Sequence, residues 1–135
     1  MIAEDYVSFE IAKLLKEKGF NEDTICVYIG MYLLIKGEGT ISNATDMPII
    51  AAPTHQMAMK YLREVHNLFI EIQFCQETEG AFNEIRWKSP TYKYKIIAIA
   101  NNNTISPFFH FVNTDFDTYE EAVEKAIKYC LEKLI

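Results

Sequence analysis

The strongest constraint on the fold lies in the last segment of the chain, TYEEAVEKAIKYCLEKLI. Its apolar residues recur at intervals of three and four, a spacing that places them on one face of an α-helix. Thr118 and Glu121 form a capping box before this pattern, and Glu124 and Lys128 are spaced for an ion pair on the solvent side. The rest of the chain must therefore cover one apolar face, which we expect to contain Tyr119, Ala122, Val123, Ala126, Ile127, Cys130, Leu131 and Leu134.

Two further amphipathic helices are predicted. The first begins after Ser8, which is a suitable N-cap, and ends at Gly19, which supplies a left-handed stop. The second should run from His55 to His66 and end near Asn67, with Thr54 as its N-cap. At about 100° per residue, its core face is expected to contain Met57, Ala58, Tyr61, Leu62 and Val65.

Alternating segments predict strands that can cover these helices. Residues 68–74 (LFIEIQF), 81–88 and 91–100 each alternate between apolar and polar side chains, which is typical of half-buried strands in an antiparallel meander. In that register Glu71 would lie near Arg86 and Glu84 near Lys95. A last strand over 105–112 contains Pro107, which favours the edge of a sheet.

The segment after the first helix is less sharply defined. Residues 25–35 consist of two short apolar runs around Gly30, which predict a hairpin or, alternatively, one strand with a bulge at Gly30. Residues 37–53 are expected to form a long loop, and such loops are often functional or mobile. The resulting fold class is α+β, a curved antiparallel sheet packed against three amphipathic helices in the order αββαβββ(β)α.

Composition limits both the organisation and the partners. The length of 135 residues predicts a single domain covering 1–135. Lys and Arg number 13 and Asp and Glu 19, a formal charge of −6, and the basic residues are scattered, which disfavours nucleic acid and anionic membranes as partners. Charges within residues 1–20 interrupt any apolar run of signal-peptide or membrane-span length, so we expect a cytoplasmic protein.

The residues that could carry chemistry do not form a known motif. Cys26, Cys75 and Cys130 are widely spaced and odd in number, which predicts free thiols and no zinc site. His55 and His66 are eleven residues apart, about 16 Å along a helix, so they cannot share a metal ion. His66 is better explained as a C-terminal helix residue that caps carbonyl groups.

Nucleophilic catalysis would require residues from distant segments. His110 with Cys75 or Cys130 is the nearest combination, but Cys130 lies on the apolar face of the last helix, where burial deactivates a thiol. Glycine-rich phosphate-binding motifs are absent. We therefore assign no catalytic residue, no metal and no cofactor, and whether the protein is an enzyme stays open, with the balance against it.

Binding surfaces are suggested by aromatic residues that exceed what one sheet face can hide. Phe108 and Phe109 on the last strand are the leading candidates, and exposed aromatic residues are typical of protein interfaces. Met59, Arg63 and His66 lie on the flank of the second helix, facing either water or a partner. A homodimer, or a complex with another protein, is the expected use of these surfaces.

Three stretches, VSFEIAKLLKEKGF, APTHQMAMKYLREVHNLFIEI and TYEEAVEKAIKYCLEKLI, resemble a family of small uncharacterised proteins from Bacteroides-type gut bacteria, many associated with prophages or other mobile elements. The resemblance implies no activity. The leading hypothesis is a non-enzymatic, self-associating interaction module of phage or mobile-element origin. The alternatives are a small-molecule-binding or catalytic domain with a pocket near the 37–53 loop, and an acidic protein that occupies a nucleic-acid-binding partner.

Overall fold

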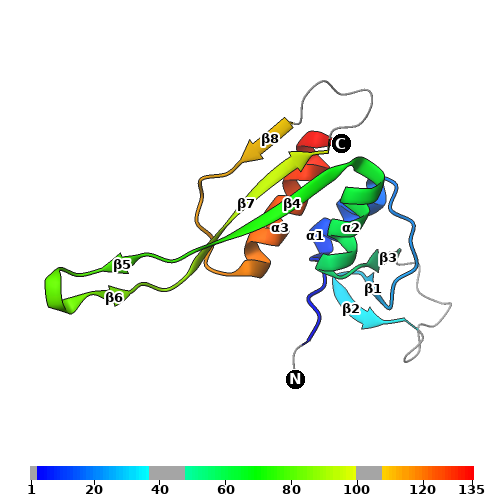
Figure 1. The fold of residues 1–135 in the computed structure, drawn as a ribbon. Coiled ribbons are helices and arrows are strands. Elements are labelled where there is room, and N and C mark those ends of the chain that lie inside the picture. Colours follow the sequence, from blue (N-terminus) through cyan, green and yellow to red (C-terminus); the bar gives the residue numbers. More distant parts are fainter. Residues whose placement is uncertain (1–2, 37–47, 100–107) are drawn as a thin grey trace.

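A computed structural model describes residues 3–36, 48–99 and 108–135, and it places three helices between two three-stranded antiparallel sheets (Figure 1). The α+β class and the three helices are confirmed, but the strands form separate sheets where one curved sheet was expected. The elements in chain order are α1 (Phe9–Glu17), β1 (Cys26–Ile29), β2 (Tyr32–Ile35), β3 (Ile49–Ala52), α2 (His55–His66), β4 (Leu68–Cys75), β5 (Thr78–Glu79), β6 (Arg86–Trp87), β7 (Thr91–Ala98), β8 (Phe108–Phe111) and α3 (Tyr119–Tyr129).

The first sheet has the order β2-β1-β3. The predicted hairpin is confirmed, since β1 pairs with β2 across a turn at Gly30, whose φ of 60° suits glycine. β3 was missed because the sequence predicts a loop through residues 37–53, and IIAA is a short run with no alternation. This strand pairs antiparallel with β1, and α1 packs against it. Residues 37–47 of the predicted loop lie outside the described residues.

Helix α2 has the predicted bounds. The hydroxyl of Thr54 accepts a hydrogen bond from the Met57 N–H, and Asn67 ends the helix with a left-handed φ of 56°. Its buried face is rotated from the expected one, because Val65 is 58% exposed whereas His55 is buried. A hydrophobic pattern counts histidine as polar, so it cannot detect an imidazole whose polar atom has a partner inside the protein.

The second sheet has the order β4-β7-β8, which contradicts the predicted meander. β4 and β7 pair along their whole lengths, from Leu68 opposite Ala98 to Cys75 opposite Thr91, so Glu71 faces Lys95 and not Arg86. β8 lies at an edge, as expected for the last strand. The meander fails because residues 81–88 do not enter the sheet.

These residues belong instead to an extension of the β4–β7 hairpin, residues 76–90, which we call the arm (Figure 1). Two short strands, β5 and β6, pair within it, and a 3₁₀ turn at Phe82–Glu84 forms its tip. Gly80 has a φ of 99°, and a Cβ at this position would lie 2.2 Å from the Glu84 carbonyl oxygen, so only glycine fits there.

Helix α3 begins as the sequence predicts, with the Thr118 hydroxyl accepting a hydrogen bond from the Glu121 N–H at 3.1 Å. The helix continues into a π-helical turn at Cys130–Leu134. The expected ion pair between Glu124 and Lys128 does not form. Lys128 pairs instead with Glu10 of α1 at 2.9 Å. The predicted apolar face is largely confirmed, and its fully buried members are Ala122, Val123, Ala126, Ile127, Cys130 and Leu131.

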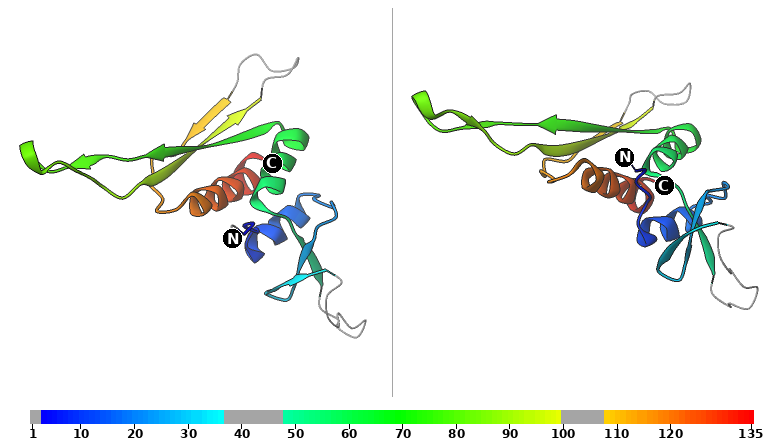
Figure 2. Two further views of the ribbon diagram at one scale, coloured as in Figure 1. Left: turned by 60° about the horizontal axis from the view of Figure 1, so that its bottom comes forward. Right: turned by 90° about the horizontal axis from the view of Figure 1, so that it is seen from below.

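One hydrophobic core joins the two sheets through the helices. Helix α3 packs on β4 and β7, and α2 packs on β4 and on α3, whereas α1 packs on β3 and also contacts α3 (Figure 2). The core cluster draws side chains from all three helices and from both three-stranded sheets. The arm lies outside it, since every residue from 76 to 90 is exposed.

The rotated face of α2 predicts unequal effects of two truncations. Leu62→Ala removes a fully buried side chain and should lower the free energy of unfolding by about 3 kcal/mol, whereas Val65→Ala should lower it by less than about 1 kcal/mol. Urea denaturation of both variants measures the difference. Equal losses would mean that Val65 belongs to the core after all.

Candidate functional site

A polar cluster that the sequence analysis did not detect ties the three helices together. Nε2 of His55, the first residue of α2, lies 2.8 Å from Oε1 of Glu124 on α3. Ser8, the N-cap of α1, donates its backbone N–H to Oε1 and its hydroxyl to Oε2, both at 2.9 Å. Glu124 thus lies at the beginnings of α1 and α2, where the helix dipoles favour a negative charge.

Burial alone would raise the pKa of the Glu124 carboxyl, but hydrogen bonds from His55 and Ser8 outweigh it and hold the pKa below its ordinary value of 4.5. The carboxylate is therefore ionised at neutral pH. The only sequence signals for this cluster were the capping position of Ser8 and the unusual placement of a histidine in the first turn of a helix.

This cluster does not have the geometry of a nucleophilic site. The Ser8 hydroxyl donates to the carboxylate and accepts from the Ile11 N–H, and no hydrogen bond joins it to His55 among the described residues. A serine nucleophile requires a base that takes its proton, in the order serine, histidine, carboxylate. Here the carboxylate stands between the other two groups, so the arrangement stabilises the fold.

The cysteines do not assemble a site either. Burial raises the pKa of the Cys130 thiol to about 12, which leaves it protonated and unreactive, as the sequence analysis expected. Cys26 is buried, Cys75 is half-buried, and all three thiols are free. His110 stacks on Tyr129 with ring centroids 3.9 Å apart. Its Nε2 is buried with no hydrogen-bond partner in the described structure, so it activates neither cysteine.

The candidate binding residues lie on two opposite sides of the second sheet. The Nε2 atom of His66 shares a hydrogen bond of 3.1 Å with the Tyr61 hydroxyl, and the two rings pack edge-on. His66 lies in the last turn of α2 as expected, and its role in capping carbonyl groups stays a prediction. Met59 packs against the core, and Arg63 is exposed. Phe109 is 53% exposed on the face away from the helices, because its neighbour His110 faces α3. No single surface therefore unites the expected residues. β8 begins at Phe108, whose side chain lies outside the described part.

Most of the exposed large apolar side chains in the described residues fall into three groups. The outer face of the second sheet carries Phe69, Phe109 and Phe111, with Lys95 lying 4.7 Å above the Phe109 ring. A second group lies on and beside the arm, and the third covers the first sheet. The group on and beside the arm consists of Phe74, Phe82, Ile85 and Trp87. The group on the first sheet consists of Ile25, Met31, Tyr32, Leu33, Leu34, Ile35 and Ile49.

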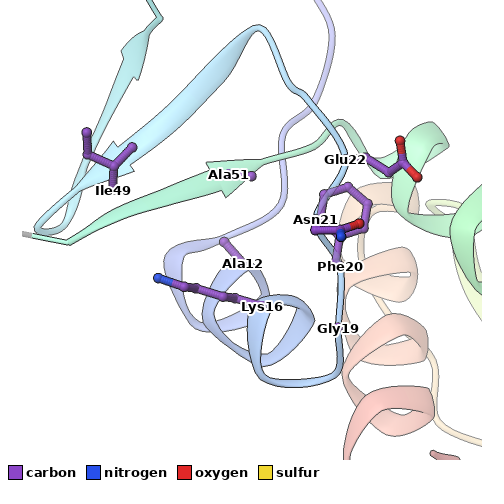
Figure 3. Close-up of a pocket in the computed structure, with 8 residues that line it drawn as sticks. All are labelled: Ala12, Lys16, Gly19, Phe20, Asn21, Glu22, Ile49 and Ala51. Atoms are coloured by element: carbon purple, nitrogen blue, oxygen red, sulfur yellow. The ribbon is translucent and has the colours of Figure 1, made fainter.

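An open cleft of about 430 Å³ lies between α1 and β3, and Ile49 and Ala51 of the predicted 37–53 loop contribute to its wall (Figure 3). Lys16 and Glu22 are its charged residues, and they point in different directions. Ligand sites usually contain a few polar groups that converge on one point. No group of three or more metal-ligating side chains occurs among the residues that the structure describes.

Comparison of the chain with models of protein families, with curated proteins and with solved structures finds no match. Within the described ranges, the helices are too short or too polar to cross a membrane. The site must therefore be interpreted from its own geometry.

The polar cluster predicts a pH-dependent contribution to stability. Because the folded state lowers the pKa of Glu124, its contribution is complete above the unfolded pKa and is lost as the pH falls through the folded pKa. Glu124→Gln should cost about 2 kcal/mol at pH 7, and the gap from the wild type should close below about pH 4.5.

Urea denaturation at several pH values measures this gap. Glu121→Gln is the matched control on the same helix, since Glu121 is exposed, and it should cost less than about 1 kcal/mol. A gap for Glu124→Gln that stayed constant down to pH 2 would contradict the assignment.

Proposed function

We propose that this chain is a non-enzymatic protein-interaction module that associates with itself. The observation that carries the proposal is the gathering of exposed aromatic side chains on the outer sheet face and on the arm. Soluble monomers rarely expose contiguous apolar patches larger than a few hundred Å². Burial against a second protein surface removes that unfavourable contact with water.

The state of the reactive groups supports a role without catalysis. The Cys130 thiol is protonated, and the Glu124 carboxylate is engaged by His55 and Ser8. Catalytic groups need an accessible side chain within reach of a substrate. The charge of −6 supports a protein partner, because a nucleic-acid surface would be repelled.

An accessory role in a prophage or another mobile element is part of the proposal, and it depends on the resemblance of the three stretches given above. Such a role needs no reaction of its own. A module of this kind would act by assembling with itself or with another protein.

The cleft between α1 and β3 favours a second candidate, the binding of a small molecule. Its volume of about 430 Å³ falls within the range of roughly 300–1,000 Å³ that is usual for ligand sites. A ligand held there would raise the unfolding temperature of the wild type, and Ile49→Trp, which would fill part of the cleft, would remove that shift.

Self-association should depend on concentration and should not weaken in high salt, because its driving force is apolar and salt screens the repulsion between two chains of like charge. Light scattering and sedimentation over a dilution series, at low and at high salt, measure both effects. A strict monomer at the highest soluble concentration would end the proposal.

A further inference from the structure

The arm is ordered within itself, yet it buries nothing. The Lys88 N–H donates to the Glu77 carbonyl at 2.8 Å, and the Gln76 side chain donates to the Lys88 carbonyl at 2.9 Å. Arg86 pairs with Glu79 at 3.0 Å. A two-stranded hairpin with no buried side chain is only marginally stable in water. The arm therefore gains stability if a further surface covers it.

The side chains at its tip are those of a binding surface. Phe82 is 93% exposed, and Ile85 and Trp87 are 62% and 68% exposed. The backbone of Phe82 has a φ of 55°, a left-handed conformation that glycine or asparagine adopts at lower cost. A tip with no role beyond its turn would be better served by glycine, so the phenyl ring at this position indicates a contact.

At the base of the arm, the sheet extends beyond the helices that cover it. Leu68 and Ile70 of β4 are buried under the helices, but Phe74 on the same face is 62% exposed. Its ring packs edge-on against Tyr92, which packs in turn against Tyr119 at the beginning of α3. These three rings, of which Phe74 is the most exposed and Tyr92 is half-buried, form an aromatic patch at the base of the arm. At this point the sheet leaves the body of the molecule (Figure 2).

The surface area that a stable interface must bury indicates how many arms take part in it. Aromatic side chains bury about 150–250 Å² each, so the exposed parts of three or four large side chains offer roughly 400 Å² per arm. One arm docked on one body would bury roughly 800 Å² in total, less than the 1,200 Å² or more of stable interfaces. Two arms exchanged reciprocally would reach about 1,600 Å².

We propose that two copies of this chain clasp each other through their arms, with the tip of each arm, at Phe82, against the partner's aromatic patch at the arm base. This inference rests on the self-association proposed above. Two identical arms laid antiparallel about a twofold axis place each tip at the other's base, so the lengths match without adjustment.

The charges of the arm are compatible with this pairing. Glu79 pairs with Arg86 and Glu77 lies 3.6 Å from Lys88, so most of the arm's charge is neutralised within it. A second acidic copy is then not repelled by the arm. The first sheet, although also apolar, adjoins residues outside the described part, and we place no contact there.

The chain carries one tryptophan, Trp87, and it lies in the middle of the arm. Its fluorescence therefore reports burial of the arm with no added label. As the concentration of the full chain rises through the dimerisation range, the emission of Trp87 should shift to the blue and its quenching by acrylamide should decrease, in step with dimer formation by sedimentation.

Two variants locate the contact. Phe82→Gly removes the ring and relieves the left-handed backbone, so the unfolding midpoint of the monomer should hold while the dimerisation constant weakens by at least about 30-fold. Met31→Ser is the matched control, because Met31 is 77% exposed on the first sheet, where we place no contact, and it should leave dimerisation unchanged. Phe109→Ser tests the outer face of the second sheet as the competing contact surface.

The outcomes separate this inference from the proposed function. Association with unchanged Trp87 fluorescence, or association that Phe109→Ser abolishes and Phe82→Gly does not, would overturn the arm contact and leave self-association standing. A wild-type chain that stays monomeric at every concentration would overturn both. If the arm binds only a different protein, the isolated chain will likewise stay monomeric, and both proposals fail.

Discussion

The carboxylate of Glu124 is the interaction on which the arrangement of the helices depends. It accepts hydrogen bonds from the N-cap of α1 and is paired with the first residue of α2, so one side chain of α3 fixes where both other helices begin. Isolated helices of this length are marginal in water and need tertiary contacts. Here the tertiary contact is polar and partly buried. It fixes the rotation of each helix about its own axis more strictly than apolar packing does.

Local patterns predicted the helices closely, because caps and helical periodicity are properties of neighbouring residues. Ser8, Thr54 and Thr118 all act as N-caps, and α2 has the predicted bounds. The rotation of α2 and the inward turn of Glu124 were not predicted, because both result from a pairing between His55 and a residue 69 positions away. A hydrophobic pattern cannot distinguish a paired polar residue inside the protein from a solvated one.

The strands show the same division between local and distant information. Alternation correctly located β4 and β7. Residues 81–88 also alternate, and the sequence pattern does not show that they pair within the arm and not with the sheet. The pattern for Ile85 and Trp87 matched a half-buried strand, although both side chains are exposed. An apolar face that stays exposed and an apolar face that packs in the protein's own core have the same sequence pattern. Phe109 is exposed because it alternates with His110, which faces α3, and its role in binding stays a prediction.

The hydrogen bonds that join the beginning of the chain to α3 and to Ile135 affect how the chain folds. Ser8 binds Glu124 across 116 positions, and the Lys18 amine donates to the carbonyl of Ile135 across 117 positions. Contacts this distant close loops of nearly the whole chain, and loop closure of that kind slows folding. On the ribosome, α1 would emerge long before α3, and the part of its buried face that contacts α3 would stay uncovered until α3 was made. The contacts between α1 and α3 therefore form late, and an early stop in translation would leave α1 without them.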